Sequence, residues 1–393
     1  MVKNTIHAVN GVSTYVIKFN GSTQLESVDD KTTGLTHIIE HCMCENIKKL
    51  EKKFKKYDIR WNAATSNTSM FFYMSGLSKY VRKFIGEFTN CILNYKITKD
   101  VFEREREIIL SEYQQEFSSQ YEQFANNFYR KFYRLPLAIG MYEDIKNVTY
   151  LQLLDFKEKY YEIPSEIIYS HAKNEKDLTL DEIEYVTKFN KIEEFTKEYN
   201  FNTTNGLVLD LSTKFDTQRI IRFHTLLRFN KNDLAKNIVC LKYLNEILSG
   251  GLTSPLYKEI REKLKGCYAL FGHSTRLNNT QLAYDVTIFA DKAKYDNIIK
   301  KLLEIFNNLN KYCTKAEFKD VQTKISNQIK YSDLVSTDTT RFADNVNADV
   351  ETIFKNKFVS YDDFLEFVEE FKKAKFYLVD DTFEKVTEVT IKK

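Results

Sequence analysis

The segment His37-Ile38-Ile39-Glu40-His41 holds the side chains with the clearest capacity for chemistry. On a helix, positions 37, 40 and 41 fall within about 100° of arc, so both imidazoles and the carboxylate project from one face. Two neutral imidazoles bind Zn²⁺ well, and a glutamate between them can accept a proton from water at the metal. This pattern predicts a hydrolytic zinc site. The alternative is an amphipathic helix with two surface histidines.

A catalytic zinc usually takes three protein ligands, so a third donor must come from another segment. Residues 101–116 are predicted to form a charged helix, and a projection at 100° per residue divides its side chains between two faces. One face holds Glu105, Ile108, Ile109, Glu112 and Glu116, and around the remainder lie Glu103, Arg104, Arg106 and Glu107. A carboxylate among buried isoleucines needs a partner or a cation. The projection does not choose between these acids, and a solvated glutamate-rich helix is the alternative.

The bulk composition places these segments in a globular protein of two domains. With 393 residues the chain exceeds what one hydrophobic core usually supports. A net charge of +3 is too small to favour nucleic acid or an anionic membrane as a partner. The six scattered cysteines are typical of reduced, mostly buried thiols. The first thirty residues lack a secretory pattern and no segment has the length of a membrane span, so we expect a cytoplasmic protein.

The order of predicted elements is similar in the two halves. In the first half, a strand at Val12–Phe19 precedes the histidine helix, β-like residues 61–77 follow it, and helices are predicted at 79–95 and 99–133, with a late strand at 167–170. The second half repeats this outline with a strand at 220–229, a helix at 233–248, a break at Gly250-Gly251, a short helix and a strand near 284–289. The polar stretch 191–205 is the predicted linker. We therefore predict an α+β fold of two tandem similar domains, residues 1–195 and 206–393, each a sheet covered by helices.

These motifs together resemble the pitrilysin (insulinase) family of zinc peptidases with an inverted HxxEH motif, in a short two-domain form similar to subunits of the mitochondrial processing peptidase. The resemblance is carried by Asn20-Gly21-Ser22, Gly34 to His41, Asn62 to Ser66, Glu105 to Glu112, and Gly250 to Lys263 with Tyr268. It covers the chain nearly from end to end. In this family such a chain is half of a clamshell that closes around an enclosed chamber.

The resemblance implies a role for each matching residue. His37, His41 and Glu112 are implied as ligands of one Zn²⁺ per chain, Glu40 as the general base, and Glu105 as an outer carboxylate that supports the site. The strand Asn62, Ala63, Ala64 and Thr65 is implied as an edge to which an extended peptide adds through main-chain hydrogen bonds. Its alternative is an ordinary edge strand.

Arg261 and Tyr268 match a pair that orients the substrate backbone and polarises the scissile carbonyl in this family. A local explanation also exists, since Ser254 and Pro255 are typical of a helix start and Gly266 of its end, which would leave Arg261 on the surface. The segment after His41 departs from the family, because it is short and carries Cys42-Met43-Cys44. Core packing is the favoured interpretation of both cysteines, with zinc ligation as the alternative.

The resulting hypothesis is a zinc endopeptidase that hydrolyses peptides or small unfolded polypeptides with metal-activated water and Glu40 as base. The domain 1–195 would hold the zinc, and the domain 206–393 would supply the substrate-orienting pair. A homodimer, or a heterodimer with a similar subunit, is predicted to share each active site between chains. The alternatives are a non-catalytic or regulatory subunit and a zinc-storage or metal-sensing protein, although the latter has no use for a glutamate that binds no metal.

Overall fold

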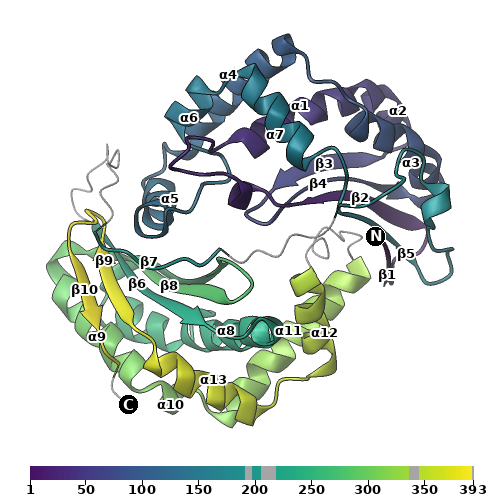
Figure 1. Ribbon diagram of the computed structural model, residues 1–393. Coiled ribbons are helices and arrows are strands. Elements are labelled where there is room, and N and C mark those ends of the chain that lie inside the picture. The colour runs from purple at the N-terminus through teal and green to yellow at the C-terminus, as the bar shows by residue number, and fades with distance from the viewer. Residues whose placement is uncertain (191–196, 205–217, 336–344, 392–393) are drawn as a thin grey trace. The chain divides into compact units, whose positions relative to one another are not determined.

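The computed structural model describes residues 1–190, 197–204, 218–335 and 345–391 (Figure 1). Contacts divide the chain into two compact units. The first unit consists mainly of Met1–Arg130 and Arg134–Phe195, and the second mainly of Thr196–Lys330 and Val346–Lys393. The predicted linker at 191–205 lies partly outside the described residues. The assignment of functions to domains stays a prediction.

The first unit is built on a five-stranded sheet with the order β1-β5-β2-β4-β3. Strand β1 is parallel to β5, and the other neighbours are antiparallel. The elements in the first half of the chain are β1 (Val2–His7), β2 (Val12–Asn20), α1 (Leu35–Ile47), α2 (Glu51–Lys56), β3 (Arg60–Thr65), β4 (Ser69–Leu77), α3 (Ser78–Leu93), α4 (Lys99–Glu116), α5 (Gln120–Tyr133), α6 (Tyr142–Asn147), α7 (Tyr150–Tyr160) and β5 (Glu166–Ala172).

Helices α1 and α3 pack on one face of this sheet, and α4 and α7 pack on α1 (Figure 1). The core between sheet and helices is made of side chains that alternate along the strands, such as Tyr15, Ile17 and Phe19 of β2, together with Ile38 and Ile39 of α1. The two isoleucines turn one side of α1 toward the sheet. The histidines between which they lie are therefore placed on the side of α1 that faces α4.

The second unit repeats this plan with a sheet of order β10-β9-β6-β8-β7, in which every pair is antiparallel. Its elements are β6 (Gln218–Arg228), α8 (Leu234–Ser249), the π-helix η5 (Tyr257–Lys263), β7 (Cys267–Arg276), β8 (Gln281–Asp291), α9 (Tyr295–Asn307), α10 (Leu309–Tyr312), α11 (Lys315–Val335), α12 (Asn345–Asn356), α13 (Tyr361–Lys373), β9 (Phe376–Asp380) and β10 (Val386–Val389). The predicted α+β fold of two similar halves, each a sheet with helices, is confirmed. Closure into a clamshell stays a prediction.

Several predicted elements need correction. The helix predicted at 99–133 is two helices, because the chain turns at 117–119 and Ser119 begins α5 by accepting the backbone N–H of Glu122 at 3.5 Å. Residues 61–77 form two strands joined by a turn at 66–68. Strands β1, β7, β9 and β10 were not predicted, since each is short, polar or at a sheet edge.

Candidate metal and catalytic site

Helix α1 begins at a point fixed by a buried carboxylate. Its N-cap Gly34 has φ 91° and no side chain to cap the helix, and Glu26 fills this role. The Glu26 oxygens accept the backbone N–H groups of Gly34 at 2.9 Å and Thr36 at 2.8 Å. Burial raises the pKa of Glu26 to about 7, while these two hydrogen bonds oppose the shift. Glu26 thus sets where the histidine helix starts.

Two glycines allow the start of α1 to pack closely on the loop before α6. A Cβ atom built on Gly140 would lie 2.5 Å from the Cα of Gly34, so neither position has room for a side chain. Two residues further, the hydroxyl of Thr36 lies 3.0 Å from that of Tyr161, which donates to the Gly21 carbonyl at 3.2 Å. These contacts fix how closely α1 packs on its neighbours and how it is rotated about its own axis.

The structure brings His37, His41 and Glu112 together as the sequence predicted. One ligand atom from each residue lies within 4.8 Å of the others. The Glu112 Oε2 atom, from α4, is 3.9 Å from His37 Nε2 and 3.7 Å from His41 Nε2. All three side chains are half-buried. The cluster is therefore accessible to solvent rather than sealed in the core.

Glu105 lies behind this cluster on the same helix. Its Oε2 atom is 3.4 Å from His41 Nδ1, and only 4% of its side chain is exposed. Arg104 Nε donates to the other Glu105 oxygen at 3.1 Å, and a further Arg104 nitrogen pairs with Glu45. A proton on His41 Nδ1, held by Glu105, leaves the lone pair of Nε2 directed at the cluster. Such a partner is typical of a metal-binding histidine.

Glu40 lies beside the cluster, but among the described residues it belongs to no group of three ligand atoms within that distance. Its carboxyl is buried, and the Thr65 hydroxyl donates to Oε2 at 2.6 Å. Burial raises the pKa of Glu40, while the Thr65 hydrogen bond and the charge of His41 lower it. Burial also lowers the pKa of His37 to about 3, helped by the charge of His41. His37 is therefore neutral near pH 7, as a ligand must be.

The donor set fits zinc better than calcium or magnesium. It offers two imidazole nitrogens and one carboxylate oxygen, a set found in catalytic zinc sites, whereas the harder cations prefer oxygen alone. The His37 ring is buried, and its interaction with the backbone of Ile139 opposes the lowering of its pKa. Its Nε2 atom faces Glu112 in the cluster, where an ion would bind.

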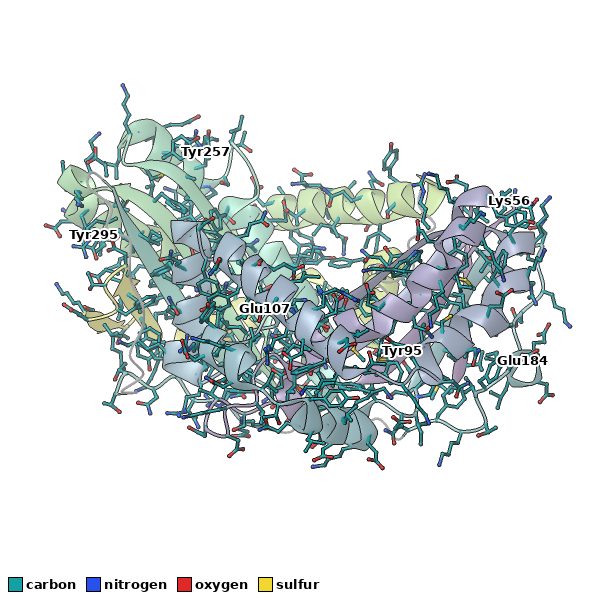
Figure 2. All side chains as sticks on the ribbon, turned by 90° about the horizontal axis from the view of Figure 1, so that it is seen from above. Lys56, Tyr95, Glu107, Glu184, Tyr257 and Tyr295 are labelled. Carbon is teal, nitrogen blue, oxygen red and sulfur yellow. The ribbon has the colours of Figure 1, made fainter. Side chains whose placement is uncertain are left out.

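The remaining acids of α4 do not enter the cluster. Glu107, labelled in Figure 2, is 69% exposed and lies 3.7 Å from Arg106. Glu116 accepts a hydrogen bond from Asn126 at 2.8 Å. The prediction that both isoleucines of this helix are buried is half wrong, because Ile109 is buried while Ile108 is 40% exposed. The buried apolar face of α4 is therefore narrower than the helical projection predicted.

Cys42 and Cys44 follow the histidines without joining the cluster. Cys42 is fully buried in the core, and Cys44 packs against the same core. Burial raises the pKa of both thiols, which opposes the thiolate form that zinc binds. This placement agrees with core packing. The wider prediction of mostly buried thiols holds for three of the six cysteines, since Cys44, Cys91 and Cys267 are half-buried.

Strand β3 is the edge of the first sheet next to the site. Among the strands that the structure describes, it pairs only with β4, with Ala63 opposite Phe72 and Thr65 opposite Met70. Asn62 is exposed, and its Oδ1 atom accepts the backbone N–H of Ala63 at 2.9 Å. Ala64 and Thr65 are half-buried. Their use by a peptide stays a prediction.

Arg261 and Tyr268 belong to the second unit. Arg261 lies in η5, and its guanidinium is 4.9 Å from the ring centre of Tyr257, which is labelled in Figure 2. Tyr268, on β7, is 73% exposed. The short helix ends as predicted near Gly266, whose N–H bonds to the Ile260 carbonyl at 2.9 Å. The role of the pair toward a substrate stays a prediction.

Comparisons with known proteins identify the family. Residues 25–143 match the family model described as insulinase (peptidase family M16), and residues 147–325 match the one described as peptidase M16 inactive domain. The chain belongs to this peptidase family, the pitrilysin or insulinase family of the predicted resemblance.

Individual relatives agree with this membership. Subunit beta of the mitochondrial-processing peptidase of Neurospora crassa is 26% identical over 142 residues, which is 34% of this chain and 30% of that protein. The match thus spans about a third of the relative's length. A protease from Helicobacter pylori has a similar fold, with a TM-score of 0.73, 18% identity and coverage of 94% of this chain and 93% of that one. An M16-like peptidase from Alicyclobacillus acidocaldarius has a TM-score of 0.70 and 16% identity, with coverage of 94% of this chain and 92% of that one.

The sequence analysis did not identify two contacts near the site, those of Glu26 and Thr65. Glu26 was not singled out, because an acid in a loop eight residues before a helix carries no local signal. Thr65 was predicted only as part of a peptide-binding strand, and its contact with Glu40 joins residues 25 positions apart. In the described part of the chain, no helix is long and apolar enough to cross a membrane.

Proposed function

We propose that this M16-family chain is a zinc-dependent endopeptidase that hydrolyses peptides or small unfolded polypeptides. The observation that supports it most is the convergence of His37, His41 and Glu112, with Glu40 beside them and outside the ligand set. A storage or sensing site gains nothing from a buried glutamate that holds no metal. A zinc hydrolase, in contrast, uses such a glutamate as the general base that takes a proton from water.

In this proposal, each group at the site has one task. Zn²⁺, when bound, supplies a Lewis acid that polarises the peptide carbonyl and acidifies water. Glu40 takes a proton from the attacking water as its oxygen bonds to the carbonyl carbon, and gives that proton to the amine nitrogen when the C–N bond breaks. Glu105 keeps the His41 ring oriented. Strand β3 aligns the peptide by main-chain hydrogen bonds.

A second candidate is a non-catalytic subunit of a peptidase complex. It is favoured by the inactive-domain description of the match over residues 147–325. That match lies outside the segment that carries His37, His41 and Glu112, so it describes a half of the chain in which no zinc motif was predicted. We therefore place the catalytic proposal first. The name of the Neurospora relative supports assembly with a similar subunit in either case.

The test is hydrolysis of a mixture of quenched peptides by zinc-loaded protein and by Glu40→Gln. An amide is nearly isosteric with the carboxylate but cannot accept the proton, so we expect one zinc per chain in both proteins and a turnover lower by about a thousandfold or more in the variant. Glu246→Gln is the matched control, because Glu246 lies on α8 and pairs with Lys324 at 2.5 Å. Zinc binding without hydrolysis by the wild type would favour the non-catalytic subunit.

A further inference from the structure

The last residue of β3 contacts the general base directly. The Thr65 hydroxyl donates to Glu40 Oε2 at 2.6 Å, a short hydrogen bond to an acid that is only 8% exposed. Within the described residues, no other hydrogen bond reaches this carboxyl group. One oxygen of Glu40 is thus held, and the other is left to take a proton.

Thr65 itself is held firmly. Its side chain lies on the same face of β3 as Ala63, which is buried in the core under α1, while Asn62 on the opposite face is exposed. The turn after it is closed by Ser66, whose N–H bonds to the Ser69 carbonyl at 2.9 Å. The hydroxyl therefore points toward α1 from a fixed strand end. It is a rigid support for the base rather than a mobile surface group.

We infer that Thr65 is a positioning residue that fixes the Glu40 carboxyl group and keeps it out of the ligand set formed by His37, His41 and Glu112. The inference deepens the proposed function and rests on it. Without the hydroxyl, a buried carboxyl has no hydrogen-bond partner in the described part of the chain and is free to rotate toward a cation. If the Glu40 carboxyl group rotates, it is no longer aligned to take a proton from water, and it offers the metal an additional oxygen ligand.

This role differs from the one implied for the rest of the strand. A main-chain contact with peptide needs no particular side chain at position 65, whereas a support for Glu40 needs a hydroxyl. The hydroxyl also ties the base to the same strand that is proposed to align the substrate. The base and the peptide would then be positioned by one element, β3.

The test compares Thr65→Val, which removes the hydroxyl at constant shape, with Thr65→Ser, which keeps it. Thr68→Val is the matched control, because Thr68 lies in the same hairpin and its hydroxyl has no hydrogen bond among the described residues. Peptide binding is measured separately in zinc-free protein through Trp61, the one tryptophan of the chain, which lies on β3. Turnover is measured with zinc.

We expect Thr65→Val to lower kcat by about tenfold or more, while Thr65→Ser stays within about threefold of the wild type. Peptide affinity and zinc content should be unchanged in both. A parallel loss of kcat and peptide affinity would overturn the inference in favour of substrate binding. A larger loss in the serine variant than in the valine variant would overturn it in favour of packing by the methyl group, which valine keeps and serine lacks.

A second readout does not depend on hydrolysis. With Co²⁺ in place of zinc, we expect the visible absorption spectrum of Thr65→Val to differ from that of the wild type, because Glu40 adds an oxygen ligand. In the Glu40→Gln background, Thr65→Val should leave the spectrum unchanged. An unaltered spectrum in Thr65→Val would overturn the inference. If the wild type binds Co²⁺ and hydrolyses nothing, the proposed function fails while this spectral comparison still decides the role of Thr65.

Discussion

The two units place a helix at the same point of the same plan and use it differently. Helix α1 follows β2 and precedes β3, and α8 follows β6 and precedes β7. On α1, the side turned to α4 carries two histidines that face two glutamates. On α8, Tyr243 is buried among aromatic rings, with Phe318 of α11 at 5.3 Å and Phe354 of α12 at 5.5 Å.

This difference between α1 and α8 distinguishes the features that the fold requires from those that the chemistry of the site requires. Both helices pack an apolar side on a sheet, so packing alone explains the shared plan. These polar groups of the first unit are buried or half-buried and contribute less to packing than aromatic rings would. Their presence therefore argues for a function, in agreement with the description of the second-half match as an inactive domain.

The largest expected effect is loss of the metal. His37→Ala and Glu112→Gln each remove one donor of a three-donor set, so zinc per chain should fall from one to well below one after dialysis, with hydrolysis at background. Metal content by atomic absorption and turnover on the same sample provide the measurement. If His37→Ala retains a full equivalent of zinc, His37 is not a ligand, and the proposed difference between α1 and α8 is wrong.

The next effect concerns the second unit's contribution to the reaction. Arg261→Ala and Glu40→Gln should each be nearly inactive alone. If sites are shared in trans within a homodimer, random exchange makes half of the dimers mixed, and one of two sites in each is intact, so about a quarter of wild-type activity should return. Exchange is followed by mass spectrometry of the mixed dimer.

Two outcomes would sharpen or contradict that expectation. No recovery despite demonstrated exchange places Arg261 and Glu40 of one chain at one site, or leaves Arg261 as the surface residue that stacks on Tyr257. Recovery only after addition of a similar second subunit would indicate a heterodimer.

A smaller effect is expected where α1 begins. In Glu26→Gln, an amide NH₂ meets the N–H of Gly34 or Thr36, which leaves a buried donor unpaired and costs about 1–3 kcal/mol of unfolding free energy. Asp233→Asn is the control, because Asp233 begins α8 without a side-chain cap. Its cost should stay below about 1 kcal/mol. Urea unfolding followed by Trp61 fluorescence reports the first unit.

The same variant has a pH signature. Because the folded pKa of Glu26 is raised from 4.5 to about 7, its protonated form stabilises the fold fully below pH 4.5, and this contribution is lost as the pH rises through 7. Glu26→Gln should remove that slope between pH 4.5 and 7. An equal slope in wild type and variant would assign it to another group.

Much of this arrangement could be predicted from local patterns. Strand β2 and helix α8 were predicted within two residues at each end, because alternation and helical period report burial directly. The zinc helix followed from the spacing of His37, Glu40 and His41. The choice of Glu112 as a ligand needed the family resemblance, since the projection placed Glu105, Glu112 and Glu116 on one face of α4 and could not choose between them.

What local patterns missed depends on distant partners. Strand β7 is an edge with mostly half-buried residues, so it lacks the alternation of a strand with one face in the core. The break between α4 and α5 has no proline or glycine, only Ser118 and Ser119. Glu26 and Thr65 act on α1 from 8 and 25 positions away. No periodicity within one segment can report such contacts.

The smallest expected effect lies in the second unit and has the opposite pH dependence to that of Glu26. Asp363 completes the N-cap of α13, where its Oδ2 accepts the Ser360 N–H at 3.0 Å and its Oδ1 accepts Lys236 Nζ at 2.6 Å. The hydrogen bond from Lys236, followed by those from Ser360, lowers the pKa of Asp363 from 3.8 to about 2. Its stabilising effect is therefore present above pH 3.8 and is lost as the pH falls toward 2.

Asp363→Asn should cost about 1 kcal/mol at pH 6, a modest value because both side chains are partly exposed and the ion pair is screened. Near pH 2.5 the difference from the wild type should fall to about a third of that value, because the carboxyl is then largely protonated in the unfolded chain but only partly in the folded one. Zinc-free protein is used at both pH values, so that metal loss does not enter. Unfolding by urea is followed by circular dichroism for the whole chain and by Trp61 fluorescence for the first unit. If the circular-dichroism transition shifts and the Trp61 transition does not, the two units unfold separately. An equal shift of both transitions would mean that the two units unfold together, so that they differ in their chemistry but not in their unfolding.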